Sequence, residues 1–188
     1  ARNPEEPVTI PTEDNVMDKI CDFISGKGFH FEPWQIATYI TALKTKPFVI
    51  LAGVSGTGKS KLPALVAEAT GGISTLVPVH PDWTDSAEVI GYKNLQGVFQ
   101  PGHLMQFINE TRKQENKNIH HVCIIDEMNL ARVEHYFAEV LSRIEDRRKS
   151  ADDGYESGPL VCGEIDEPWR NLGLPANLSI VGTVNMDE

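Results

Sequence analysis

The sequence has few cysteines, no long apolar run and a shortage of positive charge. Its three cysteines are Cys21, Cys123 and Cys162, which lie far apart and form no C-x-x-C pair. This spacing argues against a disulfide framework and favours reduced thiols. No apolar stretch approaches the roughly 20 residues that span a bilayer, and the N-terminus lacks the apolar core of a signal peptide. We therefore expect a soluble, cytoplasmic protein with no membrane partner.

Positive charge is scarce, because 17 lysines and arginines stand against 27 aspartates and glutamates, for a formal net charge of −10 at pH 7. A surface of this sign repels nucleic acid as a whole, so any contact with DNA needs a local basic patch or another subunit. The six histidines show no H-E-x-x-H or other metal-ligand spacing. The length of 188 residues suits one domain, with or without a short N-terminal extension.

The most informative stretch is Gly53-Val54-Ser55-Gly56-Thr57-Gly58-Lys59-Ser60, which matches the phosphate-binding pattern G-x-x-x-x-G-K-S/T. An apolar run over 47–52 predicts a buried strand before it, and residues 61–70 predict a helix behind it. This is the order of strand, loop and helix that the motif requires. The alternative is a glycine-rich turn that binds no ligand.

The residue types in this loop suit a nucleoside triphosphate. The glycines let successive backbone N–H groups and the positive end of the following helix face an anion. Lys59 would place a charge near the β and γ phosphates, and the Ser60 hydroxyl would join the coordination shell of Mg²⁺. The predicted nucleotide-binding residues are Gly53, Val54, Ser55, Gly56, Thr57, Gly58, Lys59, Ser60 and Lys61.

A second stretch, 122–127, places two carboxylates directly after four apolar residues. It predicts a buried strand that delivers Asp126 and Glu127 at its carboxyl end, the edge where open parallel sheets bind ligands. We expect Asp126 to hold Mg²⁺ and Glu127 to polarise a water for attack on the γ-phosphate. The alternative is a pair of acids that stabilise the N-terminus of the next helix.

A third apolar stretch, 178–183, predicts a strand that leads to Asn185. In a parallel sheet its end would meet those of the other two strands, so the Asn185 amide could orient the water or contact the γ-phosphate. An ordinary turn asparagine is the alternative. The predicted catalytic residues are Glu127, Lys59 and Asn185, and the predicted metal ligands are Ser60 and Asp126.

Apolar spacing and helix-end residues predict the remaining elements. The first helix is expected to start at a Thr12 N-cap, to carry Val16, Met17, Ile20, Phe23 and Ile24 on one face, and to close at Gly26 and Gly28. Further helices are expected over 33–44, after Pro101-Gly102, and over 130–144, the last ending near 147–149 in a solvated basic turn. The sequence also predicts a strand over 75–80, a short helical turn from Thr84 to Ile90, a hairpin over 91–100, a loop over 112–118 and a long functional loop or ordered insertion over 150–175.

Three motifs in this order resemble an AAA+ NTPase module: the glycine loop, Ile125-Asp126-Glu127-Met128-Asn129, and Gly182-Thr183-Val184-Asn185-Met186-Asp187. Within that superfamily the chain resembles the McrB family, the GTP-hydrolysing motors of 5-methylcytosine-dependent restriction systems. The resemblance implies an α/β fold, a P-loop NTPase core of three α/β/α layers around a central parallel sheet. It also implies Walker A at 53–60, Walker B at Asp126 and Glu127, and Asn185 as the first sensor.

The resemblance implies a linker and helix over 1–28 and an AAA+ core over 29–188, with a hairpin over about 92–100 that interrupts the second core helix. The sequence departs from the family at Leu130, where McrB has an arginine, so that arginine's role is not transferred. Asp187 is unassigned because it lies nearer the sensor asparagine than the family's acid does. The final core strand, arginine finger, helical lid and second sensor are expected beyond Glu188, and this chain alone is expected to show weak or no turnover.

For the whole protein, the resemblance implies a ring oligomer, a hexamer, that acts with an McrC-like nuclease on DNA, with Mg²⁺ as cofactor and ATP or GTP as substrate. The choice of base stays open, because no Asn-Lys-x-Asp guanine motif occurs. The alternatives are a MoxR-like protein-remodelling ATPase and a nucleotide-dependent assembly switch. An intact Glu127 argues against the switch, because a switch needs no acid that polarises water. No acceptor-pocket signature supports a small P-loop kinase.

Overall fold

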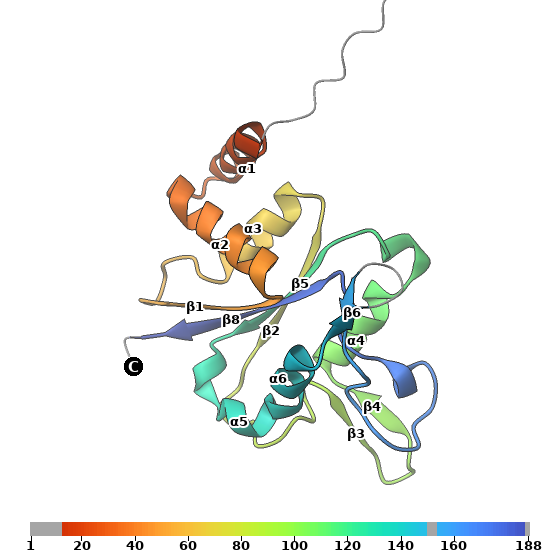
Figure 1. Cartoon of the computed structure of the whole chain (residues 1–188). Helices are drawn as coiled ribbons and strands as arrows, with labels where there is room; N and C mark the ends of the chain where they lie inside the picture. The colour runs from red at the N-terminus through yellow and green to blue at the C-terminus, as the bar shows by residue number, and fades with distance from the viewer. Residues whose placement is uncertain (1–12, 150–153, 187–188) are drawn as a thin grey trace, which may run out of the picture.

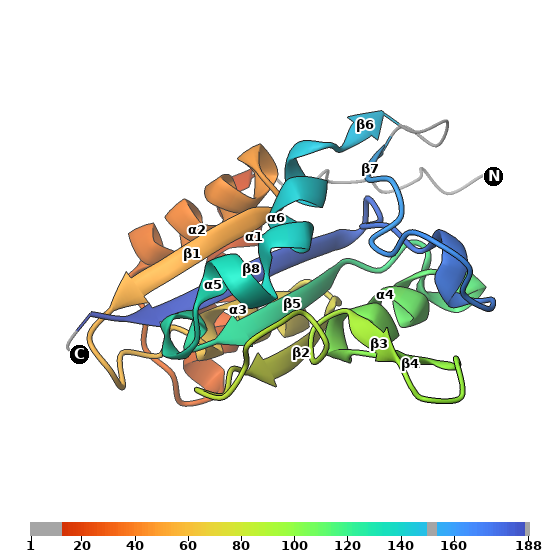
Figure 2. The same ribbon diagram turned by 90° about the horizontal axis from the view of Figure 1, so that it is seen from below.

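A four-stranded parallel sheet forms the centre of the molecule in a computed structural model that describes residues 13–149 and 154–186. Its strands are β1 (Phe48–Gly53), β8 (Leu178–Asn185), β5 (His121–Asp126) and β2 (Ile73–Pro78), in that order across the sheet. Helices cover both faces, as Figures 1 and 2 show. The predicted three-layer α/β/α arrangement around a central parallel sheet is therefore confirmed.

Side chains of the two central strands alternate between two apolar cores. Val122 and Ile124 of β5 pack with α1 (Glu13–Gly26), α2 (Pro33–Thr45) and α3 (Lys61–Ala69). Cys123 and Ile125 face the opposite core. Because successive strand residues point to opposite faces, a strand buried on both sides must be apolar throughout, and β5 is buried from His121 to Ile125.

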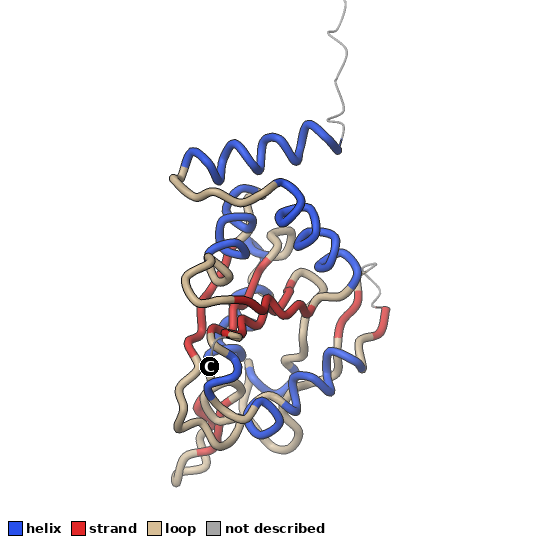
Figure 3. The backbone as a smooth tube through the Cα atoms, turned by 90° about the vertical axis from the view of Figure 1, so that its left-hand side faces the viewer, coloured by secondary structure: helices blue, strands red, loops and turns tan. Residues whose placement is uncertain are grey.

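The first helical layer carries the chain into the phosphate loop. Helix α1 lies outermost, against α2 and α3, and Ile20 and Ile24 are its buried anchors (Figure 3). Helix α2 begins with Pro33 at its first position behind a capping box of Glu32 and Gln35, and it leads directly into β1. The glycines Gly26 and Gly28 end α1 as expected, whereas the Thr12 cap lies outside the described residues.

The second layer contains α4 (His103–Thr111), α5 (Val133–Tyr136) and α6 (Ala138–Glu145), with the expected hairpin formed by β3 (Gly91–Lys93) and β4 (Phe99–Pro101). The predicted second strand starts two residues earlier than expected and ends at Pro78. The connections within the described ranges contain the 3₁₀ turns η1 (Gln114–Asn116), η2 (Met128–Leu130) and η3 (Trp169–Asn171). Over Thr84–Ile90 the chain makes a single turn, in which the Ser86 carbonyl oxygen accepts from the N–H groups of Val89 and Ile90. Asp85, rather than the expected Thr84, accepts from the Ala87 N–H at 2.9 Å.

The prediction of one long helix over 130–144 is wrong. The segment divides into η2, α5 and α6, with Phe137 at φ −123°, ψ 0° between the two helices. Both Tyr136 and Phe137 are fully buried, and the Tyr136 hydroxyl donates to the Met128 carbonyl oxygen at 2.9 Å. A straight helix would point two adjacent residues about 100° apart, so the break lets both rings enter the core.

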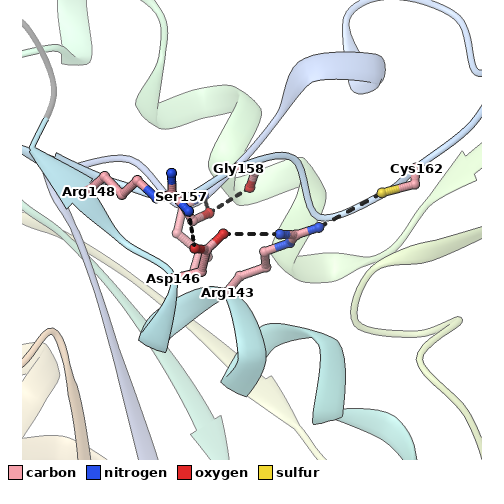
Figure 4. A network of polar contacts seen from close by, with 7 residues as sticks. Arg143, Asp146, Arg148, Ser157, Gly158 and Cys162 are labelled. Carbon is pink, nitrogen blue, oxygen red and sulfur yellow. Dashed lines mark hydrogen bonds and ion pairs between the residues drawn. The ribbon is translucent and has the colours of Figure 1, made fainter.

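The prediction of a basic helix end over 147–149 is wrong, because α6 ends at Glu145, although Arg148 and Lys149 are exposed as expected. Arg148 and Lys149 form β6 (Arg148–Lys149), which pairs antiparallel with β7 (Tyr155–Glu156) in the long connection. The Asp146 carboxylate accepts from Arg148 at 3.2 Å and from Arg143 at 3.3 Å (Figure 4). Arg147 turns inward and donates to the carbonyl oxygens of Pro175 and Leu178, and burial lowers the pKa of its guanidinium to about 10. The described part of this connection is thus an ordered insertion.

Among the described helices, none combines the length and the apolar character that a membrane span requires.

His121 gives the stability of this fold a pH dependence. The residue is 1% exposed at the start of β5, its Nδ1 lies 2.8 Å from the Ile119 carbonyl oxygen, and among the described residues its Nε2 has no partner. Burial lowers the pKa of the ring, and the bond to Ile119 opposes this in part. Below the unfolded pKa of about 6.5 the unfolded chain therefore binds more protons than the folded chain. We predict that the free energy of unfolding, measured by urea denaturation, falls between pH 7.5 and pH 5.5, and falls less in His121→Gln. Equal pH slopes for the two proteins would contradict this assignment.

Candidate functional site

A cleft of about 540 Å³ opens at the carboxyl edge of the sheet, where β1, β5 and β8 end. It is lined by residues 55–61 of the phosphate loop, by Asp126 and Glu127 after β5, by Thr183 and Asn185 of β8, and by residues 29–31. The register places Gly53 beside Asn185. Of the predicted site residues, only Gly53 and Val54 do not line the cleft, and these two contribute backbone carbonyls behind it.

The phosphate loop turns through two glycines in the left-handed region, Gly56 at φ +77° and Gly58 at φ +83°. A Cβ on Gly58 would come within 2.9 Å of the Phe31 ring, so this glycine also permits the ring to lie against the loop. The N–H groups of Lys61 and Leu62 donate to the Gly58 carbonyl oxygen, which starts α3 directly at the loop. The positive end of α3 thus faces the cleft, as an anion site requires.

The Lys59 ammonium lies inside the loop. It donates to the carbonyl oxygens of Gly53 at 3.0 Å and Val54 at 2.6 Å. The Thr57 hydroxyl also donates to the Val54 oxygen, at 2.8 Å. The loop therefore carries a half-buried positive charge that only neutral carbonyl oxygens balance among the contacts of the described chain.

The Asp126 carboxylate joins two strands and the loop. Its Oδ1 accepts a short hydrogen bond from the Ser60 hydroxyl and a second bond, of 2.8 Å, from the Thr183 hydroxyl. The two predicted metal ligands are therefore in direct contact. Within the described ranges no cluster of three or more His, Cys, Asp or Glu side chains could hold a metal. A hydroxyl and one carboxylate nevertheless suit Mg²⁺, which usually takes its other ligands from phosphates and water.

Glu127 stands in an unusual backbone conformation, with φ +54° and ψ +52°. It is the one non-glycine residue with positive φ in the described chain. Its N–H donates to the Thr183 hydroxyl at 2.9 Å, and its Oε1 accepts from the Asn185 amide at 3.0 Å. Non-glycine residues in this region cost of order 1–3 kcal/mol and concentrate at functional sites.

The chain after Glu127 is fixed by its own contacts. The Glu127 carbonyl oxygen accepts from the Leu130 N–H at 3.0 Å, and the buried Tyr136 hydroxyl binds the Met128 carbonyl oxygen. The Met128 side chain packs against Gly182 of β8, where a Cβ would come within 2.6 Å of the Met128 sulfur. The left-handed turn is therefore determined by packing on both sides.

Beyond the predicted site residues, the cleft is also lined by Leu76, Thr183 and the segment 29–31. Thr183 was placed in the predicted strand without a role, although it shares a strand face with Asn185 two residues later. The segment 29–31 lies between the first two helices, and the sequence assigned it no role. In the structure the Lys61 ammonium lies 6.0 Å from the centre of the Phe29 ring. The strand period could have indicated Thr183, whereas no spacing in the sequence indicated the aromatic segment.

Comparison with known families adds a decisive observation: the family described as "AAA domain (dynein-related subfamily)" matches residues 48–185. The chain belongs to this AAA family. It is a nucleotide-binding module of the AAA+ class, and the resemblance drawn from its motifs is confirmed. The chain is also 27% identical over 157 residues to the Type IV methyl-directed restriction enzyme EcoKMcrB subunit of Escherichia coli (strain K12), a match that covers 80% of this chain. The chain spans about a third of that protein's length, 33%.

Substitution of Gly58 tests whether the Phe31 ring packs on the phosphate loop. Replacing Gly71, which has φ +72° and open space around it, by alanine should cost about 1–2 kcal/mol of unfolding free energy, the usual cost of a left-handed alanine. Gly58→Ala has the same backbone cost and also meets the tip of the half-buried Phe31 ring, which must turn aside, so we expect a further ~0.5–1.5 kcal/mol. Urea denaturation of both variants measures the difference. Equal losses would show that Phe31 does not pack on the loop.

Proposed function

We propose that this AAA module hydrolyses the terminal phosphate of ATP or GTP with Mg²⁺. The observation that carries the proposal is the Glu127 carboxylate, held 3.0 Å from the Asn185 amide beside the bonded pair of Asp126 and Ser60. A charged acid, an amide and a metal-binding pair then line the same cleft as the phosphate loop. This is the set of groups that in-line phosphoryl transfer to water uses.

The phosphate loop would bind the triphosphate. The N–H groups of residues 55–60 and the N-terminus of α3 would face its oxygens, and the Lys59 ammonium would exchange the Gly53 and Val54 carbonyls for phosphate. Ser60 and Asp126 would hold Mg²⁺, which supplies charge neutralisation for the β and γ phosphates. These residues bind and orient the substrate.

Glu127 would act on the attacking water. Its Oε1 accepts from Asn185, and no hydrogen bond within the described ranges engages its Oε2. That oxygen is free to accept a hydrogen bond from a water and then its proton, as a general base does. Asn185 would hold the carboxylate in this orientation through its amide, and the left-handed turn keeps Glu127 from rotating away.

The aromatic segment would lie beside the nucleotide's base. Phe29 and Phe31 line the same cleft as the loop, and aromatic faces stack on any nucleobase. Stacking does not choose between adenine and guanine, so the substrate is proposed as ATP or GTP.

The similarity to the EcoKMcrB subunit supports a role as the NTPase motor of a DNA restriction system. In that setting the AAA core, proposed to start near residue 29, would work in a ring, a hexamer, with an McrC-like nuclease as partner. Because the net charge is −10, DNA would be bound by other parts of the assembly or by a local patch.

Glu127→Gln tests the chemical step. We expect phosphate release by the natural full-length protein to fall by about 100-fold or more, the usual scale of a lost general base, with nucleotide binding retained. Glu134→Gln is the matched control, because Glu134 is an exposed acid of α5 without a described partner. Release would be measured with GTP and ATP in parallel.

The two nucleotides separate the candidate functions. GTP-selective release that is lost in Glu127→Gln supports the restriction motor, and ATP-selective release moves support to a protein-remodelling ATPase. Nucleotide binding without phosphate release from either substrate would contradict hydrolysis and leave an assembly switch.

A further inference from the structure

Thr183 occupies the point where the metal-binding and water-activating residues meet. It is 1% exposed on β8, between the ends of β1 and β5, and none of the site predictions included it. We propose that Thr183 is a positioning residue for hydrolysis, whose hydroxyl holds the Asp126 carboxylate and the Glu127 backbone in one geometry. This inference rests on the proposed nucleotide hydrolysis at the same cleft.

The two bonds of the hydroxyl determine its orientation. It donates to Asp126 Oδ1 at 2.8 Å and accepts from the Glu127 N–H at 2.9 Å. A hydroxyl has one hydrogen, and here that hydrogen is used on Asp126, while a lone pair meets the N–H. The side chain thus links two consecutive residues through different parts, the carboxylate of one and the backbone of the other.

The first bond of the Thr183 hydroxyl fixes the orientation of the Asp126 carboxylate. The hydroxyls of Ser60 and Thr183 both donate to Oδ1, and Oδ2 makes no hydrogen bond within residues 13–149 and 154–186. If Ser60 bound a cation instead, Thr183 would still hold the carboxylate. Groups that orient a metal ligand in this way typically change metal affinity or activity by about 10–100-fold when they are removed.

On the Glu127 side, β8 holds the residue at two points. Thr183 holds its N–H and Asn185 holds its carboxylate, and these two β8 side chains share one face of the strand. The left-handed backbone at Glu127 needs such contacts, because an unconstrained glutamate would leave that region. Loss of the hydroxyl would leave the N–H without its acceptor and free the turn that aims the carboxylate.

Thr183→Val and Thr183→Ser distinguish the effect of the hydroxyl's hydrogen bonds from the effect of side-chain packing. Valine keeps the shape and loses both bonds, whereas serine keeps the hydroxyl and loses a methyl group. Ser179→Ala is the matched control, because Ser179 is a buried hydroxyl on the same strand, four residues before the site. Kinetics of phosphate release, nucleotide affinity with and without Mg²⁺, and melting temperature would be measured on the natural full-length protein.

We expect kcat of Thr183→Val to fall by about 10–100-fold with little change in KM or in Mg²⁺-free nucleotide affinity. Thr183→Ser and Ser179→Ala should stay near the wild-type kcat. A wild-type kcat in Thr183→Val, or equal losses in the valine and serine variants, would overturn the proposal. If the valine variant does not fold, Thr183→Ala replaces it and is judged by the same outcomes.

Failure of the proposed hydrolysis can be distinguished from failure of the proposed role of Thr183. If wild type binds nucleotide but releases no phosphate, hydrolysis is refuted, and the Mg²⁺ dependence of nucleotide affinity then decides the role of Thr183. Loss of that dependence in the valine variant, with its retention in the serine variant, would support positioning of Asp126. An unchanged Mg²⁺ dependence in the valine variant would refute it.

Discussion

The site depends on the insertion of β8 between β1 and β5. Because β8 pairs in parallel with both, Gly53, Asp126 and Asn185, which are separated by about 60 residues or more in the sequence, reach the same edge of the sheet. A shift of this register by one residue would move Thr183 and Asn185 to the opposite face of the sheet from Asp126, and would place Ile180 and Val181 each in the other's core. The apolar packing of both faces therefore also fixes the position of the polar groups.

A second constraint concerns the two adjacent acids. Consecutive strand residues point to opposite faces, so Asp126 and Glu127 could not both reach the cleft from a regular strand. The left-handed backbone at Glu127 ends β5 after Asp126 and redirects the chain, so that both carboxylates line the cleft. The turn is stabilised from the far side by the buried Tyr136 hydroxyl, which donates to the Met128 carbonyl oxygen.

The strands and the phosphate loop could be predicted from the sequence because each has a local signal: an apolar run, glycines at fixed spacing, or acids at a strand end. The placement of Asn185 beside Glu127 followed from parallel topology. The broken helix could not be predicted, since Leu130 and Phe137 fit a helical period and the deciding contact joins Tyr136 to Met128. Arg147 and Phe31 were missed because their partners lie far away in the sequence. Long-range packing overrode local pattern at these positions.

The site also differs from the rest of the buried interior in its hydrogen bonding. Within the described ranges, the buried side-chain atoms without a partner are Tyr39 Oη, His121 Nε2 and Arg147 Nε, and none of them lies in the cleft. Lys59, Ser60 and Asp126 instead bond to protein atoms. A phosphate that bound Lys59 and a cation that bound Ser60 would therefore replace existing hydrogen bonds, so the net gain from each of these new contacts would be small. Affinity then depends on charge and on the number of loop amides, whereas Thr183 and Asn185 keep their bonds and can preserve the geometry of the acids through the exchange.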